Sequence, residues 1–94
     1  MQMAIRAHIY YLSADWGTWD FGDGESLKTV VEQADRRYAE AEHVEAVDID
    51  WAKVAIQNTA GTDFGQETKL KDFNFADSDK ILVVSSAPGG GGNG

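Results

Sequence analysis

The sequence predicts an α+β domain in which one helix packs across a sheet that contains both the first and the last strand of the chain. Apolar and polar side chains alternate over residues 3–11, as they do in a half-buried strand. Residues 26–38 instead place apolar side chains at helical spacing. Residues 81–84 are apolar without interruption, as in a central strand. Strands near both ends and one amphipathic helix between them define this fold class.

The composition supports one folded domain and excludes several classes of function. Ninety-four residues provide a single core, and an apolar content of 43% excludes a disordered chain over most of this length. The absence of cysteine excludes disulfides, thiolate metal sites and cysteine nucleophiles. A formal charge of −8 argues against a nucleic-acid partner and favours either solubility alone or a basic partner.

Two observations bear on the compartment. The first residues, Met1 to Arg6, lack the basic and then apolar form of a secretory signal. No apolar run approaches the length of a membrane span. We therefore expect a cytoplasmic protein without a membrane partner.

The front of the chain predicts a hairpin. Residues 13–17 contain turn formers, and Trp19 and Phe21 then alternate with polar residues as a second strand. Trp19 is expected in the core because it lies on the apolar side of that strand. Trp16 and Trp51 are instead candidates for exposed contact residues.

The predicted helix has a start signal and an apolar face. Ser26 follows the glycines of residues 22–24 and is the expected N-cap. The pattern extends over about four turns, and residues 39–42 are able to prolong it. The apolar face consists of Leu27, Val30, Val31, Ala34 and Tyr38.

The second half of the chain is less regular. Residues 39–50 are an acidic connector without a clear periodicity. Residues 53–57 predict a third strand that ends in the turn formers of residues 58–61, and residues 62–66 offer at best a short strand. The apolar spacing in residues 70–75 predicts one helical or 3₁₀ turn. With the last strand, we expect a mixed sheet of four or five strands.

The apolar run of residues 81–84 determines the expected sheet. Because it is apolar on both faces, we expect it at the centre of the sheet and parallel to the first strand, as in a β-grasp fold. Periodicity alone does not distinguish this fold from a ferredoxin-like arrangement. Ile81 and Val83 would face the helix, which leaves Leu82 and Val84 on the open face as a candidate partner surface.

No other group of residues predicts a catalytic or metal site. His8 and His43 are isolated from one another and lack the spacing of metal ligands. The carboxylate pairs in residues 48–50 and 77–79 are better explained as solvated surface acids than as a catalytic dyad. We therefore expect no cofactor and no catalytic residue.

The end of the chain resembles ubiquitin. Residues 69–75, KLKDFNF, are similar to its segment T-L-S-D-Y-N-I. A polar turn and the last apolar strand follow in both. The count from Phe75 to the diglycine Gly89-Gly90 is also the same in both. The resemblance therefore ends on the residues that form the functional end of ubiquitin.

The front half agrees in the same register. Ser26 lies as far beyond Phe21 as ubiquitin's helix cap lies beyond its second strand, and residues 60–61 match the A-G turn after its third strand. The resemblance covers most of residues 3–90, interrupted by the longer connector at 39–52. The chain is similar to the ubiquitin-like modifiers and looks closest to the bacterial ones.

This resemblance implies a particular kind of function. It predicts a β-grasp domain over residues 1–86 and a glycine-rich tail over residues 87–94. The protein would be a modifier and not an enzyme: an E1-like activating enzyme would adenylate the carboxylate of Gly90, and an E2-like conjugating enzyme would pass it to target proteins. Glycine has no Cβ, so Gly89 and Gly90 fit the narrow channel of such enzymes.

The tail departs from the family pattern in two ways. Four residues follow the diglycine and would have to be removed. The resemblance implies a tail-processing peptidase of the JAB/JAMM type that cuts between Gly90 and Gly91, although a cut after Gly92 would leave a diglycine too. Residues 86–88 also replace the basic residues that precede ubiquitin's diglycine, so recognition by a eukaryotic activating enzyme is not expected.

Two other functions stay open. A sulfur carrier would convert the same carboxylate into a thiocarboxylate, but such carriers usually end on the diglycine itself. A non-covalent β-grasp adaptor would use a surface and carry an inert tail. Neighbouring genes would separate the three: activating and conjugating enzymes for the modifier, thiamin or molybdopterin genes for the carrier, and neither for the adaptor.

Overall fold

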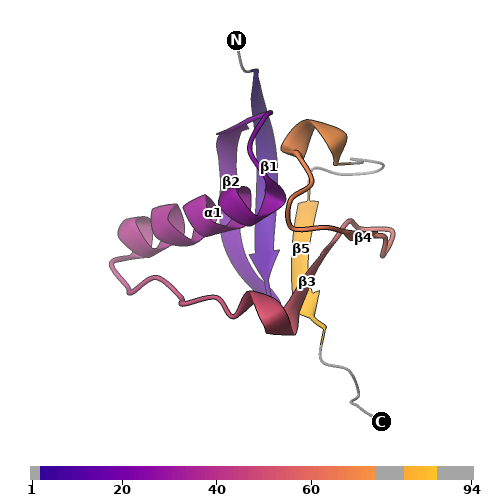
Figure 1. The fold of residues 1–94 in the computed structure, drawn as a ribbon. Coiled ribbons are helices and arrows are strands. Elements are labelled where there is room, and N and C mark those ends of the chain that lie inside the picture. The colour runs from indigo at the N-terminus through magenta and orange to yellow at the C-terminus, as the bar shows by residue number, and fades with distance from the viewer. Residues whose placement is uncertain (1–2, 74–79, 87–94) are drawn as a thin grey trace, which may run out of the picture.

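A computed structural model describes residues 3–73 and 80–86 of the chain. In these residues a five-stranded mixed sheet is crossed on one face by the helix α1 (Figure 1). No helix within them is long and apolar enough to cross a bilayer. The elements are β1 (Ala4–Tyr11), β2 (Ala14–Gly22), α1 (Leu27–Glu42), the 3₁₀ turn η1 (Trp51–Lys53), β3 (Val54–Gln57), β4 (Asp63–Phe64), the 3₁₀ turn η2 (Leu70–Asp72) and β5 (Lys80–Ser85).

The strand order confirms the predicted fold class. The strands lie in the order β2-β1-β5-β3-β4, so β5 occupies the centre between β1 and β3. It runs parallel to β1 and antiparallel to β3, whereas β2 and β4 pair antiparallel with β1 and β3 at the two edges. A hairpin, a crossing helix and a central last strand parallel to the first make up the β-grasp arrangement.

The β1–β2 hairpin turns earlier than the sequence predicts. Its turn consists of Leu12 and Ser13, whose φ values of 48° and 76° are both positive, as a type I′ turn requires. β2 therefore begins at Ala14, and the predicted turn over residues 13–17 is wrong in extent. Two left-handed residues suffice to reverse the chain, so the turn formers after them are free to pair with β1.

A bulge in β2 turns Trp16 to the same face of the strand as Trp19. Trp16 and Gly17 lie opposite the single residue Ile9, which shifts the alternation of side chains by one. Gly17 has the positive φ of 90° that glycine adopts without strain. Trp16 is consequently buried, with 3% exposure, against the prediction of an exposed contact, while Trp19 is half-buried and packs against the core, as predicted. The Trp19 indole donates its Nε1–H to the Trp16 carbonyl over 2.7 Å and fastens the bulge.

The helix begins and ends at local signals. Ser26 is the N-cap, as predicted, and its Oγ accepts a hydrogen bond from the Thr29 amide at 3.2 Å. The helix continues to Glu42 and ends on His43 in the left-handed conformation, with a φ of 57°. The predicted apolar face is confirmed: Leu27, Val30, Val31 and Ala34 are fully buried and Tyr38 is half-buried.

The core lies between α1 and the sheet face that α1 covers. Ile81 and Val83 of β5 are buried beneath the helix, as predicted, with Ile9 and Ile56 from the two flanking strands. Leu70 joins the same cluster, and the turn η2 on which it lies confirms the predicted 3₁₀ turn, although Phe75 of that predicted pattern lies outside the described residues. Full burial of one such aliphatic side chain contributes about 1.5–3 kcal/mol, so this cluster is the main favourable term.

The connector after α1 is attached to the helix. Val47 donates its amide N–H to Oδ1 of Asp35 at 2.9 Å, and the Trp51 indole donates its Nε1–H to Oε2 of Glu32 at 3.1 Å. Ile49 packs against the core between these two anchors. Trp51 is half-buried, so the prediction that it is an exposed contact is wrong. The sequence does not reveal its burial, because the Glu32 carboxylate that it contacts lies on a helix distant in sequence.

Val30→Ala should lower the free energy of unfolding by about 1–3 kcal/mol, because the Val30 side chain has no exposed surface and its truncation leaves a cavity under the helix. Val44→Ala is the matched control. Val44 is 56% exposed beyond the helix, so its truncation should change stability by less than about 0.5 kcal/mol. Urea denaturation of both variants measures the difference. Equal losses in the two variants would contradict the assigned helix face.

Candidate functional site

The residues predicted to react lie outside the described part of the chain. Gly89, Gly90 and Gly91 belong to the tail, so their activation and processing stay predictions. The last described residue is Ser86, whose amide donates to the carbonyl of Lys53 at 3.0 Å. This hydrogen bond holds the end of β5 beside the start of β3, at the end of the sheet opposite the start of β1 (Figure 1).

The open face of the sheet carries an apolar patch at its centre. Alternate residues of β5 are buried beneath α1, so Leu82 and Val84 point to the opposite face, as predicted, and are half-buried there. Strand pairing sets Tyr10 of β1 next to Leu82 and Ala55 of β3 next to Val84. We call Tyr10, Ala55, Leu82 and Val84 the open-face patch.

Two shallow hollows adjoin this patch. One, of about 320 Å³, is lined by Tyr10, Thr59, Lys80 and Leu82. The other, of about 360 Å³, is lined by Tyr10, Ser13, Leu82, Val83 and Val84. Because Tyr10 and Leu82 border both hollows, side chains of a partner seated in either one would contact the patch. Such open hollows suit the side chains of a protein better than an enclosed small molecule.

Sequence reasoning predicted neither Ala55 nor Tyr10 as a member of the patch, and Tyr10 is the larger of the two. Along the sequence it is one of the outward residues of an alternating strand, and Leu82 lies near the other end of the chain. Only the parallel pairing of β1 with β5 brings the two side by side. The available signal was an aromatic side chain at an outward strand position, where its apolar body needs a neighbour to cover it.

Polar and charged side chains surround Tyr10. The His8 ring stacks on the Tyr10 ring with centroids 4.6 Å apart, and the Lys80 ammonium lies 5.6 Å from the Tyr10 centroid. His8 Nε2 is 2.6 Å from Oδ1 of Asp15, which also accepts the Gly17 amide at 2.8 Å. The hydrogen bond with His8, and then that with Gly17, hold the pKa of Asp15 below its ordinary value.

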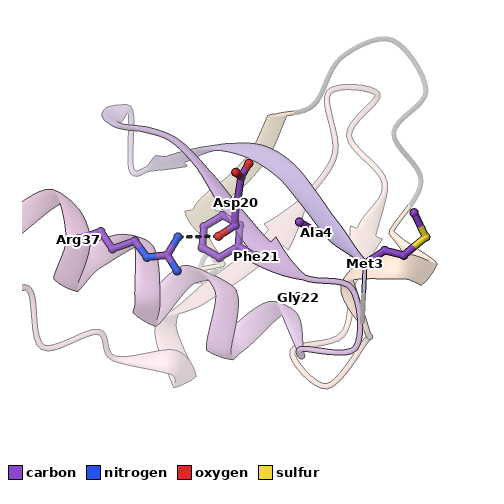
Figure 2. A pocket seen from close by; sticks show the side chains of 6 residues that line it. All are labelled: Met3, Ala4, Asp20, Phe21, Gly22 and Arg37. Atoms are coloured by element: carbon purple, nitrogen blue, oxygen red, sulfur yellow. Dashed lines mark hydrogen bonds between the residues drawn. The ribbon is translucent and has the colours of Figure 1, made fainter. Parts of the chain in front are cut away.

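A further hollow lies beside β2 and is bordered by an internal contact. Figure 2 shows Arg37 reaching from α1 toward Asp20 and Phe21. Its guanidinium donates to the Asp20 carbonyl at 2.6 Å and lies 5.0 Å from the Phe21 ring centroid. The hollow, of about 270 Å³, is also lined by Met3, Ala4 and Gly22. An added strand would pair with the edge of the sheet through backbone groups such as the Asp20 carbonyl. Because Arg37 already occupies this carbonyl, we interpret the contact as protection of the β2 edge against pairing with another chain.

Sequence comparison does not assign the chain to a family. Neither a protein-family model nor a curated protein matches it. Among the residues that the structure describes, no three histidine or carboxylate side chains are grouped to hold a metal ion. The protein is an α+β domain of β-grasp topology with an apolar patch on its open sheet face.

His8→Ala should raise the pKa of Asp15 toward its ordinary value, because it removes the largest cause of the depression. A carboxyl NMR titration measures the change. Thr18→Ala, which alters the residue paired with His8 on β2, should leave the Asp15 titration unchanged. The lowered pKa also determines how the stability of the fold depends on pH. Ionised Asp15 stabilises the fold fully above the ordinary carboxyl pKa of the unfolded chain, and this stabilisation is lost as the pH falls through the lower pKa of the folded protein. An unaltered Asp15 pKa in His8→Ala would show that the contact does not persist in solution.

Proposed function

We propose that this protein is a ubiquitin-like modifier that a peptidase trims after Gly90 and that is then joined through this residue to amines of target proteins. The observation that carries the proposal is the position of the last strand. β5 lies at the centre of a β-grasp sheet, and the chain leaves it at Ser86, with only residues 87–88 before Gly89-Gly90. A diglycine this close to a fixed strand is what a protein that donates its own carboxylate needs.

The length of the tail supports this use. An extended chain advances about 3.3 Å per residue, so a stretch of the length from Ser86 to Gly90 would span about 15 Å if it were extended. A carboxylate at that distance enters a nucleotide site while the folded domain stays outside. The absence of a Cβ at Gly89 and Gly90 lets the backbone pass through a channel that other residues would block.

The open-face patch supports a partner surface at the same end of the molecule. Val84 belongs to the patch and lies on the strand that leads into the tail. An activating or conjugating enzyme that covers the patch is therefore positioned to receive the tail as well. The half-buried Leu82 and Tyr10 supply apolar surface, and apolar and aromatic residues of this kind carry much of the binding energy of protein interfaces.

In this proposal the chain supplies a reactant and no catalytic group. The Gly90 carboxylate attacks the α-phosphorus of ATP on an E1-like enzyme and displaces pyrophosphate. A thiol of the enzyme then displaces AMP and forms a thioester, and an E2-like enzyme receives the chain by thiol exchange. The amine of the target finally displaces the thiol and forms the amide bond.

Gly90→Arg should abolish adenylation and conjugation without changing the stability of the domain, because an arginine side chain does not pass a channel built for glycine. Gly92→Arg is the matched control: it lies beyond the proposed cut and should be removed with the rest of the tail, so conjugation should proceed. Intact mass spectrometry with the native enzymes measures both, and we expect a product joined through Gly90 to a target amine.

Other products would redirect the assignment. Conjugation of Gly90→Arg together with failure of Gly92→Arg would move the cut to the second diglycine. A thiocarboxylate at the chain end would identify a sulfur carrier. Persistence of all 94 residues beside an active peptidase would leave a non-covalent adaptor.

Leu82→Ser should weaken binding of the activating enzyme by about tenfold or more, because it removes an apolar side chain from the centre of the open-face patch. Thr18→Ala, on the same face but on the edge strand β2, should bind normally. Fluorescence anisotropy measures the affinities, and thermal unfolding of both variants separates lost binding from lost folding. Wild-type affinity in Leu82→Ser would place the enzyme on another surface.

A further inference from the structure

A cleft lies between α1 and the connector that follows it. The connector, residues 44–50, runs back along the helix (Figure 1) and is held there by the hydrogen bonds of Val47 to Asp35 and of Trp51 to Glu32. The space left between the two segments has a volume of about 330 Å³. It is lined by Glu32, Asp35, Arg36, Ala46, Val47, Asp48 and Ile49.

Asp35 is a buried carboxylate with an incomplete set of partners. The residue is only 5% exposed, yet it lines the cleft. Its Oδ1 accepts the Val47 amide at 2.9 Å, while Oδ2 receives no hydrogen bond from the described residues. A carboxylate offers about four acceptor positions, so most of those of Asp35 are unused. Burial raises the pKa of Asp35, and the hydrogen bond from Val47 and the positive charge of nearby Arg36 only partly oppose this.

Negative charge surrounds this carboxylate. Glu32 lies one helical turn before Asp35, and Asp48 lines the connector side of the cleft. Residues 39–50 contain five carboxylates and no lysine or arginine. Arg36 is the one cation in the lining, and its side chain is exposed and forms no ion pair within the described residues. The cleft therefore favours a positive ligand.

Apolar side chains line the rest of the cleft. Val47 is 43% exposed although it is a large aliphatic residue, and Ala46 and Ile49 lie on either side of it in the lining. Lysine and arginine bury their methylene stems along such surfaces while the charged end seeks a polar partner. An apolar wall beside a buried carboxylate matches both halves of a long basic side chain.

We propose that this cleft binds a lysine or arginine side chain of a partner protein, with its positive group paired to Oδ2 of Asp35 and its stem against Val47 and Ile49. The acidic lining and the apolar wall together fit a peptide segment that is basic and partly apolar. Binding supplies the partner that Asp35 lacks and offsets part of the free energy lost by burying it. The site does not depend on the modifier function, because the tail takes no part in it.

The test uses the full chain and a defined probe. The blocked tetrapeptide Leu-Arg-Leu-Arg is titrated into the protein and followed by amide NMR. We expect the largest shifts at Val47, whose amide is bonded to Asp35, and at residues 46–49. The same peptide with citrulline in place of both arginines is neutral and similar in shape, and it should bind about tenfold more weakly. The Asp35 carboxyl signal should titrate at a lower pKa when the arginine peptide is bound.

Four variants locate the site. Asp35→Asn removes the charge but keeps an oxygen for the Val47 amide, and it should weaken binding about tenfold. Glu67→Gln makes the same change of charge at an exposed loop residue and should bind as the wild type does. Arg36→Ala removes the competing cation and should strengthen binding, whereas loss of the exposed cation in Lys69→Ala should have no such effect.

Two results would overturn the proposal. Equal shifts around Glu67 and the other exposed carboxylates, or equal binding of the citrulline peptide, would show that the general acidity of the surface attracts the probe. Unchanged affinity in both Asp35→Asn and Arg36→Ala would also show that the probe does not bind in the cleft. Arg36→Ala is included because it tests the cleft without altering the buried carboxylate. A failure of Gly90 to conjugate leaves these outcomes untouched, so the two proposals fail separately.

Discussion

The parallel pairing of β1 with β5 is the constraint on which the rest of the fold depends. It joins Ile9 to Ile81 and Tyr11 to Val83, and a hydrogen bond from the Leu12 amide to the Val83 carbonyl at 2.9 Å extends it. Parallel neighbours cannot be joined by a tight turn, so the chain between them must cross over, and α1 then covers the buried face. Closing so long a loop costs conformational entropy, which burial of the core offsets.

The same pairing builds the open-face patch on the other side of the sheet. Side chains of a strand alternate between faces, so the register that buries Ile81 and Val83 also sets Leu82 beside Tyr10. A slip of one residue would bring Leu82 under the helix and expose the present core residues of β5. The core and the candidate partner surface are therefore specified by one register.

Polar side chains of α1 secure the segments that strand pairing does not reach. Arg37 caps a carbonyl on the edge of β2, and Glu32 and Asp35 hold the connector. Asp35 differs from the other two because its carboxylate is deeply buried and accepts a single hydrogen bond, which makes its burial costly. Functional sites are where natural proteins accept such local conflicts.

Local patterns in the sequence determined the helix with its Ser26 cap, the apolar last strand and the diglycine, because caps and periodicity depend only on residues close together in the chain. The tertiary structure decided the rest. Trp16 is buried because a bulge changes the side-chain alternation relative to the partner strand, which the sequence of one strand does not reveal. The Trp51 anchor and the contact of Tyr10 with Leu82 join residues far apart in the chain, so only the packed sheet and helix bring them together.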